Sequence, residues 1–259
     1  MTTGRFLLGG WTWSPALLLA GAAALAAYLA AFRDRRRAGY FLAALGLLGC
    51  TLLSPLATLA DGYLFSAHMA QHILLLLIVP ALLLLSLPRS LALAVRPRAL
   101  GRPLAGWIAG VGAMWFWHAP ALCDAAVASP AVHALQTGSL LVLGAAFWRP
   151  ILAPRESERL DPPGAVLYLF SACVACSVLG IIITFSPVEV CSVYARPPAD
   201  GLGLLGMIRG DWGFTPERDQ QVGGLLMWVP MCLVYLGAIV AQLARWFGEP
   251  ARPATAEAP

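Results

Sequence analysis

The sequence predicts an all-α membrane protein, a polytopic bundle of about seven transmembrane helices. Of its 259 residues, 59% are hydrophobic and only 12% are charged, whereas a soluble domain usually carries about a quarter charged residues. An apolar stretch of roughly 18 to 25 residues is long enough to cross the hydrocarbon core of a bilayer. Seven apolar stretches, of which the fourth is short at 16 residues, use most of the chain, so we expect one integral membrane domain over residues 1–259.

Short polar connections separate the seven stretches. The longest connection, 186–220, is predicted to be a loop, and the first stretch is predicted to be a retained span because its arginines follow it rather than precede it. The predicted spans cover residues 13–32, 40–60, 68–88, 104–119, 130–148, 164–185 and 221–247.

The arginines predict how the bundle is oriented. All of the positive charge is arginine, and 13 of the 17 fall on the connections after spans one, three and five or on the C-terminal tail. Because cytoplasmic loops carry an excess of positive charge, we expect the N-terminus outside and the C-terminus in the cytoplasm. Arginines confined to such juxtamembrane clusters do not form a face that follows a nucleic-acid backbone, so no nucleic-acid partner is expected. The 13 are Arg33, Arg35, Arg36, Arg37, Arg89, Arg96, Arg98, Arg102, Arg149, Arg155, Arg159, Arg245 and Arg252.

All four histidines fall at the outer depth in this topology. His68 and His72 open the third span, His118 closes the fourth and His133 begins the fifth. A helix aims residues i and i+4 at the same face, so His68 and His72 could act together as a bidentate ligand. Any one of these histidines could equally be an ordinary side chain at the membrane interface. Ionisable groups inside membranes are rare, however, so a set of four indicates a functional site. The set therefore predicts a metal or cofactor site at the outer end of the bundle.

Sulfur-containing side chains could complete such a site. Met69 follows His68, and Met227 and Met231 are four residues apart near the outer end of the last span. Methionine commonly fills gaps between helices, but a thioether beside imidazoles would favour Cu(I).

The cysteines are less informative. The mid-span pair Cys173 and Cys176 is expected to be small apolar packing, while Cys123 and Cys191 lie on the outer side and could pair, at a distance that the sequence does not determine.

Two polar elements near the outer surface have both a structural and a functional interpretation. Asp219, Gln220 and Gln221 begin the last span, where an aspartate usually caps a helix. The Asp219 carboxylate could also orient a metal-binding imidazole from the second shell, and Gln220, Asp124 and Gln71 could do the same. Phosphate loops, nucleophile elbows and H-E-x-x-H motifs are absent from the sequence.

Three segments together resemble the seven-span CtaG family. They are LFSAHMAQHILLLLIVPALLLLSLP, MWFWHAPALCDAAVASPAVHALQ and DQQVGGLLMWVP, and the resemblance extends over most of the chain. It implies a bacterial plasma-membrane protein whose outer histidines handle copper for assembly of a haem–copper cytochrome c oxidase. The corresponding residues are His68, Met69, Gln71 and His72, then Trp117, His118, Pro120 and Asp124, and finally Asp219, Gln220 and Gln221.

The sequence departs from the family pattern at one position of the site. The resemblance implies two histidines four residues apart in the fifth span, whereas here His133 is followed at that spacing by Thr137. Either the site lacks one ligand or this chain binds its metal differently.

These observations favour a non-enzymatic copper-binding assembly factor. Its ligands would be His68, His72, His118, His133 and Met69, its metal Cu(I), and its partners oxidase subunits and copper donor proteins. A zinc-dependent hydrolase with Asp124 or Asp219 as general base and a b-type cytochrome with histidine-ligated haem remain as alternatives. Whether the protein forms a homodimer stays open.

Overall fold

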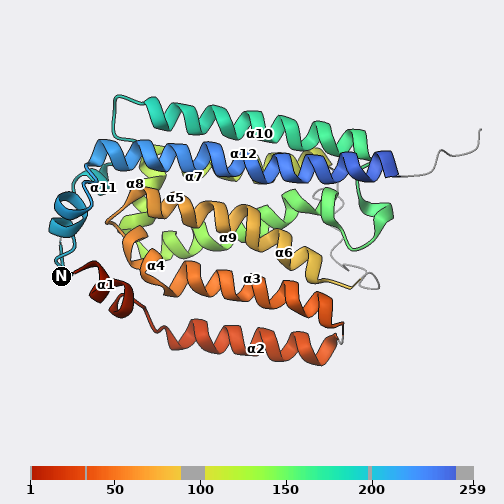
Figure 1. The fold of residues 1–259 in the computed structure, drawn as a ribbon, viewed down its shortest axis with the longest axis horizontal. Coiled ribbons are helices and arrows are strands. Elements are labelled where there is room, and N and C mark those ends of the chain that lie inside the picture. Colours follow the sequence, from red (N-terminus) through yellow and green to blue (C-terminus); the bar gives the residue numbers. More distant parts are fainter. Residues whose placement is uncertain (1, 33, 89–102, 198–199, 249–259) are drawn as a thin grey trace, which may run out of the picture.

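A computed structural model of the protein describes residues 2–32, 34–88, 103–197 and 200–248. All regular elements in these residues are helices, which confirms the all-α fold (Figure 1). The long helices run back and forth between two ends of the molecule, and most of them share one buried hydrophobic core. They are α2 (Pro15–Ala31), α3 (Arg35–Leu53), α5 (Phe65–Ile73) continued by α6 (Val79–Ser86), α7 (Pro103–Trp117), α9 (Pro130–Leu152), α10 (Pro162–Phe185) and α12 (Pro216–Gly248).

Short helices gather at the end where α5, α9 and α12 begin, which we call the histidine end. They are α1 (Thr3–Gly9), α4 (Pro55–Ala60), α8 (Pro120–Ala128), α11 (Ser192–Ala195) and a π-helical turn at Met207–Asp211. At the opposite end, a 3₁₀ turn at Glu156–Glu158 joins α9 to α10.

Each of the seven predicted spans falls on a helix, but only some of these helices are long and apolar enough to cross a membrane. Four qualify among the described residues: Phe65–Ser86, Pro130–Leu152, Pro162–Phe185 and Pro216–Gly248. The other three ranges fall on α2, on α3 with α4, and on α7. A count of seven membrane crossings therefore stays a prediction.

The last helix begins earlier than the sequence predicted. It starts at Pro216 rather than at 221, so the segment predicted as a loop ends at 215 and also contains α11 and a π-helical turn. Proline is favoured in the first turn of a helix, and Glu217 and Asp219 lie in the same turn, where carboxylates complement the positive end of the helix dipole.

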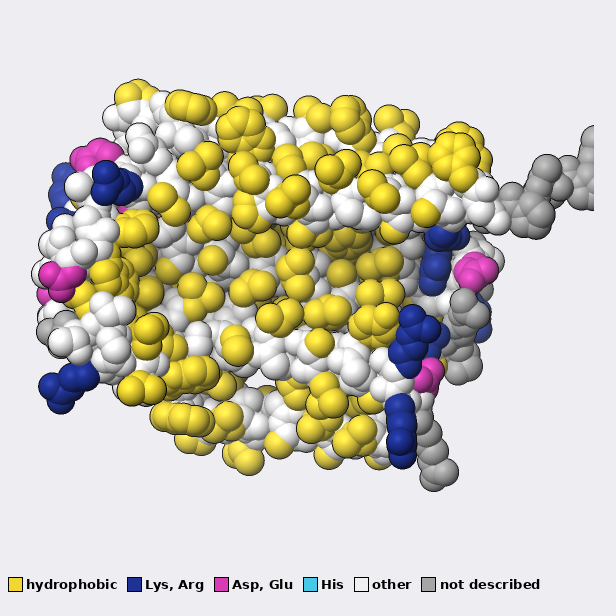
Figure 2. All heavy atoms as spheres, viewed as in Figure 1, with side chains coloured by type: hydrophobic (Ala, Val, Ile, Leu, Met, Phe, Trp, Pro, Cys, Tyr) yellow, Lys and Arg dark blue, Asp and Glu magenta, His cyan; other side chains and the backbone are white. Residues whose placement is uncertain are grey.

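An apolar band surrounds the bundle between its two ends. Figure 2 shows hydrophobic side chains covering this face, with the arginines and carboxylates gathered at the ends. Large side chains such as Leu19, Leu167 and Phe170 are more than half exposed in this band, as expected for surfaces that face lipid. Six arginines used to predict the orientation lie outside the described residues: Arg33, Arg89, Arg96, Arg98, Arg102 and Arg252.

The helix that carries two of the histidines runs through the middle of the bundle (Figure 1). Pro80 has no N–H to donate to the carbonyl of Leu76, and the turn before it widens into a π-helix at Leu74–Ile78. Gly144 on α9 packs directly against the Leu76 carbonyl oxygen, where an added Cβ would clash. The irregular turn thus lies just beyond His72 and is held by a close approach of α9.

Candidate metal centre

The four histidines converge at the histidine end, although they come from two helices and the turn after a third. The ring centroids of His68 and His72 on α5 lie 4.4 Å apart. His118, just after α7, lies 5.1 Å from His72, and His133, near the start of α9, lies 6.1 Å from His68. The predicted clustering of all four side chains is therefore present in the fold.

His68 and His72 are buried without hydrogen-bond partners. Each side chain is about 1% exposed, and none of the four ring nitrogens of the pair forms a hydrogen bond with the protein. The side-chain amide of Gln136 lies close enough to interact with His72, but the two do not form a hydrogen bond. A neutral imidazole has one N–H donor and one acceptor nitrogen. Leaving a buried polar group unsatisfied costs roughly 1–3 kcal/mol, so the pair is costly unless something else binds these nitrogens.

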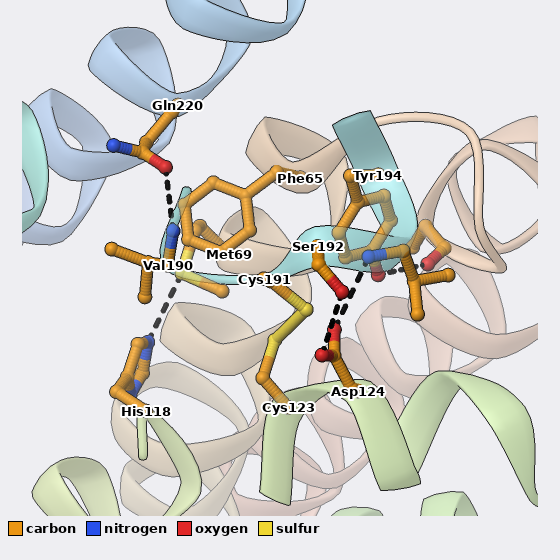
Figure 3. The surroundings of a disulfide bond; sticks show 12 residues. Phe65, Met69, His118, Cys123, Asp124, Val190, Cys191, Ser192, Tyr194 and Gln220 are labelled. Carbon is orange, nitrogen blue, oxygen red and sulfur yellow. Dashed lines mark hydrogen bonds between the residues drawn. A yellow bond between two sulfur atoms is a disulfide. The ribbon is translucent and has the colours of Figure 1, made fainter. Parts of the chain in front are cut away.

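His118 presents its second nitrogen to a methionine sulfur. Its Nδ1 lies 2.6 Å from the Met114 carbonyl oxygen, which can only accept, so Nδ1 carries the proton. Nε2 then has a free lone pair, and it lies 3.0 Å from Sδ of Met69 (Figure 3). Two atoms that both offer lone pairs gain little from contact by themselves. Ligand nitrogen and sulfur atoms on one metal lie about 3.0–3.5 Å apart, given bonds of roughly 2.0 and 2.3 Å, so this pair has the spacing of two ligands.

His133 is the accessible member of the cluster. It is partly exposed and lines a cavity of about 800 Å³ between α3, α4, α8 and α9, together with Asp61, Tyr63 and Thr137. Gln71 also lines this cavity, but its side-chain amide donates to the Thr51 carbonyl oxygen at 2.7 Å. The contacts of Gln71 therefore connect α5 to α3 rather than to an imidazole.

Asp219 caps the helix that carries His68. Its carboxylate is 4% exposed and accepts from the backbone N–H groups of Phe65 and Ser66 at 2.7 and 3.0 Å. The sequence suggested that this residue caps its own helix or orients a histidine, whereas its contacts lie on the first turn of α5. It positions His68 and His72 through the backbone.

Gln220 and Asp124 fasten the connection between α10 and α12. The Gln220 side-chain oxygen accepts from Val190 N at 2.8 Å, and Asp124 accepts from the Ser192 hydroxyl and from Val193 N (Figure 3). Cys123 and Cys191 form a disulfide beside these bonds, with Cα atoms 5.7 Å apart, so the pairing that the sequence left open is present. Three links therefore hold this segment against α8 and α12.

Tyr194, which was not among the residues predicted for the site, packs against His68 from this segment. Its ring centroid lies 5.9 Å from that of His68 and 5.8 Å from that of Phe65, and its hydroxyl donates to the Ala60 carbonyl oxygen at 2.6 Å. Burial raises the pKa of this phenol well above its ordinary value, so the hydroxyl stays protonated as a donor. No local signal identifies Tyr194, because its role depends on the folded connection.

Other sulfur and amide groups lie nearby without completing a preformed site. Met227 and Met231 are fully buried in the same core cluster as Met69. Gln136 is buried one turn after His133, with an unpartnered Nε2, and its i+3 spacing from His133 could have indicated it. Within the described residues, no three or more His, Cys, Asp or Glu side chains are already arranged to hold a metal ion.

Comparison with known proteins decides the family. The family described as cytochrome c oxidase caa3 assembly factor (Caa3_CtaG) matches residues 16–249, which include all four histidines. The chain belongs to the Caa3_CtaG family.

Relatives of this Caa3_CtaG chain include much longer mycobacterial proteins. Uncharacterized proteins of Mycobacterium bovis, Mycobacterium tuberculosis and Mycobacterium leprae are each 25% identical to it over 218 residues. The match covers 75% of this chain, which spans about a third of the length of these relatives. No solved structure matches it.

Proposed function

We propose that this member of an oxidase assembly-factor family binds Cu(I) at the histidine end and delivers it to subunits of a haem–copper oxidase. The ligands are His68, His72 and His118 with Met69, and His133 is the fourth imidazole. The observation that carries the proposal is the buried pair His68 and His72, whose four ring nitrogens lack partners. A bound cation would use the unprotonated nitrogens and remove part of this cost.

The donor set favours a soft cation. Imidazole suits several transition metals, but a thioether sulfur selects Cu(I). The contact between His118 Nε2 and Met69 Sδ supplies one donor of each kind at 3.0 Å. The side chains are not yet arranged as a closed cage, which suits a protein that must release its cargo.

Copper would enter and leave past His133. This imidazole lines the 800 Å³ cavity, whereas His68, His72 and His118 are buried. The Tyr194 ring, on the disulfide-linked segment, packs 5.9 Å from the His68 ring. Copper donor proteins and oxidase subunits would therefore dock over α4 and α9 at the mouth of this cavity.

The membrane arrangement belongs to the same proposal. We place the protein in the bacterial plasma membrane with seven crossings, the histidine end outside and the C-terminus in the cytoplasm. In the described residues, seven of the arginines used for this orientation lie at the opposite end, against four at the histidine end. A C-terminal reporter active only outside the cytoplasm would reverse this orientation.

A hydrolase is not favoured by the carboxylates near the histidines. In Asp124 and in Asp219, both carboxylate oxygens accept a hydrogen bond, from a backbone N–H group or from the Ser192 hydroxyl. A general base needs a carboxylate that can reach a metal-bound water. We therefore propose a binding and transfer role rather than catalysis.

Copper titration of purified protein tests the proposal. His72→Ala and His118→Ala should each weaken Cu(I) binding at this site by at least ten-fold, because even changes outside the ligand shell cost 10–100-fold. Gln242→Ala is the matched control, since Gln242 is a buried polar residue of α12 near its far end. Oxidase activity in cells should fall with the histidine variants only. Unchanged copper affinity and oxidase activity in both histidine variants would refute the site.

A further inference from the structure

Three thiols and two hydroxyls lie between α10 and α12, away from the histidines. Sγ of Cys173 lies 3.2 Å from Sγ of Cys232, and Ser177 Oγ lies 3.0 Å from the same Cys232 sulfur. Cys176, one turn along α10, lies 3.7 Å from the Tyr235 hydroxyl. The sequence grouped Cys173 with Cys176, whereas the fold pairs Cys173 with Cys232.

The pairing is fixed by close contact between the two helices. An added Cβ at Gly180 would lie 2.8 Å from the side chain of Trp228, and one at Gly224 would overlap Thr184. Small residues allow helices in membranes to approach closely. These two contacts set the register of α10 against α12, and this register places Cys173 opposite Cys232.

The sulfur pair lies midway along the length of the two helices. Cys173 is near the middle of α10, and Cys232 is near the middle of α12. Gly223 packs against Met69, because an added Cβ there would lie 3.2 Å from Met69 Cγ. Cys232 is nine residues further along α12, which corresponds to about 13 Å at 1.5 Å per residue. The Cys173 and Cys232 thiols are therefore separated from Met69 and the histidines.

Hydrogen bonds connect Cys173, Cys232 and Ser177. Ser177 donates to the Cys173 carbonyl oxygen at 2.7 Å, so its oxygen is free to accept from the Cys232 thiol, which in turn accepts from the Cys173 thiol. Both cysteines are only partly buried. Each thiol thus has a proton to lose and a sulfur that already faces the other.

We propose that Cys173 and Cys232 form a second site for Cu(I), separate from the histidines. Binding breaks two S–H bonds and forms two Cu–S bonds, releases two protons to the buffer, and transfers no electron. Bonds of about 2.3 Å from a d¹⁰ ion to cysteine sulfur would hold the two sulfurs about 4 Å or more apart. The two sulfurs would therefore have to move apart from their 3.2 Å separation, by rotation about the two Cα–Cβ bonds.

Soft donors continue between the two sites. Met227 and Met231 share the buried face of α12, and Met231 directly precedes Cys232. Thiolates and thioethers both prefer Cu(I) to harder cations. The inference extends beyond the proposed function, because it assigns a binding site in mid-helix that the outer histidines do not require.

Anaerobic titration of the detergent-solubilised full chain with Cu(I) tests this site. Binding should produce near-ultraviolet thiolate-to-Cu(I) absorption in the parent and equally in His72→Ala, so that failure of the outer site does not remove the signal. Cys173→Ser and Cys232→Ser should each lose this absorption and bind at this site at least ten-fold more weakly. Cys50→Ser is the control, because Cys50 is an exposed free cysteine.

Thiol labelling of the unaltered protein gives an independent measurement in case a variant does not fold. Cu(I) should protect Cys173 and Cys232 from maleimide, mapped by mass spectrometry, while Cys50 continues to react. Absence of the absorption in the parent, its retention in Cys232→Ser, or equal labelling with and without Cu(I) would overturn the proposal. Recovery of a Cys173–Cys232 disulfide in place of bound copper would overturn it as well.

Discussion

Replacing Asp219 tests whether the histidine helix is held through its backbone. The Asp219 carboxylate accepts two hydrogen bonds, from Phe65 N and Ser66 N, in an almost completely buried position. A hydrogen bond to a charged group contributes roughly 1.5–3 kcal/mol. Asp219→Asn keeps one acceptor oxygen but turns an NH₂ group towards a backbone donor, so we expect a loss of about 1.5–3 kcal/mol. For a chain of this size that corresponds to a fall in Tm of roughly 3–12 °C.

The assay is thermal unfolding in detergent followed by tryptophan fluorescence, with Asp200→Asn as the matched control. Asp200 makes the same pair of bonds, to Leu204 N and Leu205 N at 2.7 and 3.2 Å, but it is exposed. Water can replace a partner there, so its variant should lose no more than about 1 kcal/mol. Equal melting of Asp219→Asn and the parent, or equal losses in both variants, would refute the reasoning.

Three further changes probe the packing around the site. Gly144→Ala should lower the free energy of unfolding by about 1–3 kcal/mol, because its Cβ would overlap the Leu76 carbonyl oxygen; melting no lower than the parent would show that α9 can shift. Cys123→Ser should cost at most about 4 kcal/mol, the loop-closure value for the 68-residue separation from Cys191, and dithiothreitol should destabilise the parent but not this variant. Tyr194→Phe should cost about 1–2 kcal/mol by removing a buried donor, measured by thermal unfolding; an unchanged Tm would mean that its hydroxyl contributes no net stability.

Local rules of the chain determined the parts of the site that lie on one helix. Apolar stretches of membrane-spanning length predicted the long helices, because backbone groups in lipid must be satisfied within the segment. The helical repeat placed His68 and His72 on one face without knowledge of any neighbour. The alternating direction of the predicted spans placed His118 and His133 at the same membrane depth as this pair. In the fold, all four rings converge.

The contacts that complete the site depend on how separate helices pack. The sequence predicts that Asp219 caps its own helix. In the fold its carboxylate instead accepts from the start of α5, including the N–H group of Ser66, which is 153 residues away in the sequence. Likewise, the sequence groups Cys173 with Cys176, three residues along the same helix. In the fold, the sulfur that faces Cys173 belongs to Cys232 on α12. Interhelical register is set by side-chain volumes on both surfaces, including the glycines that let α10 and α12 approach. Sequence periodicity specifies which face of a helix a residue occupies, but only the packed bundle specifies which residue lies opposite.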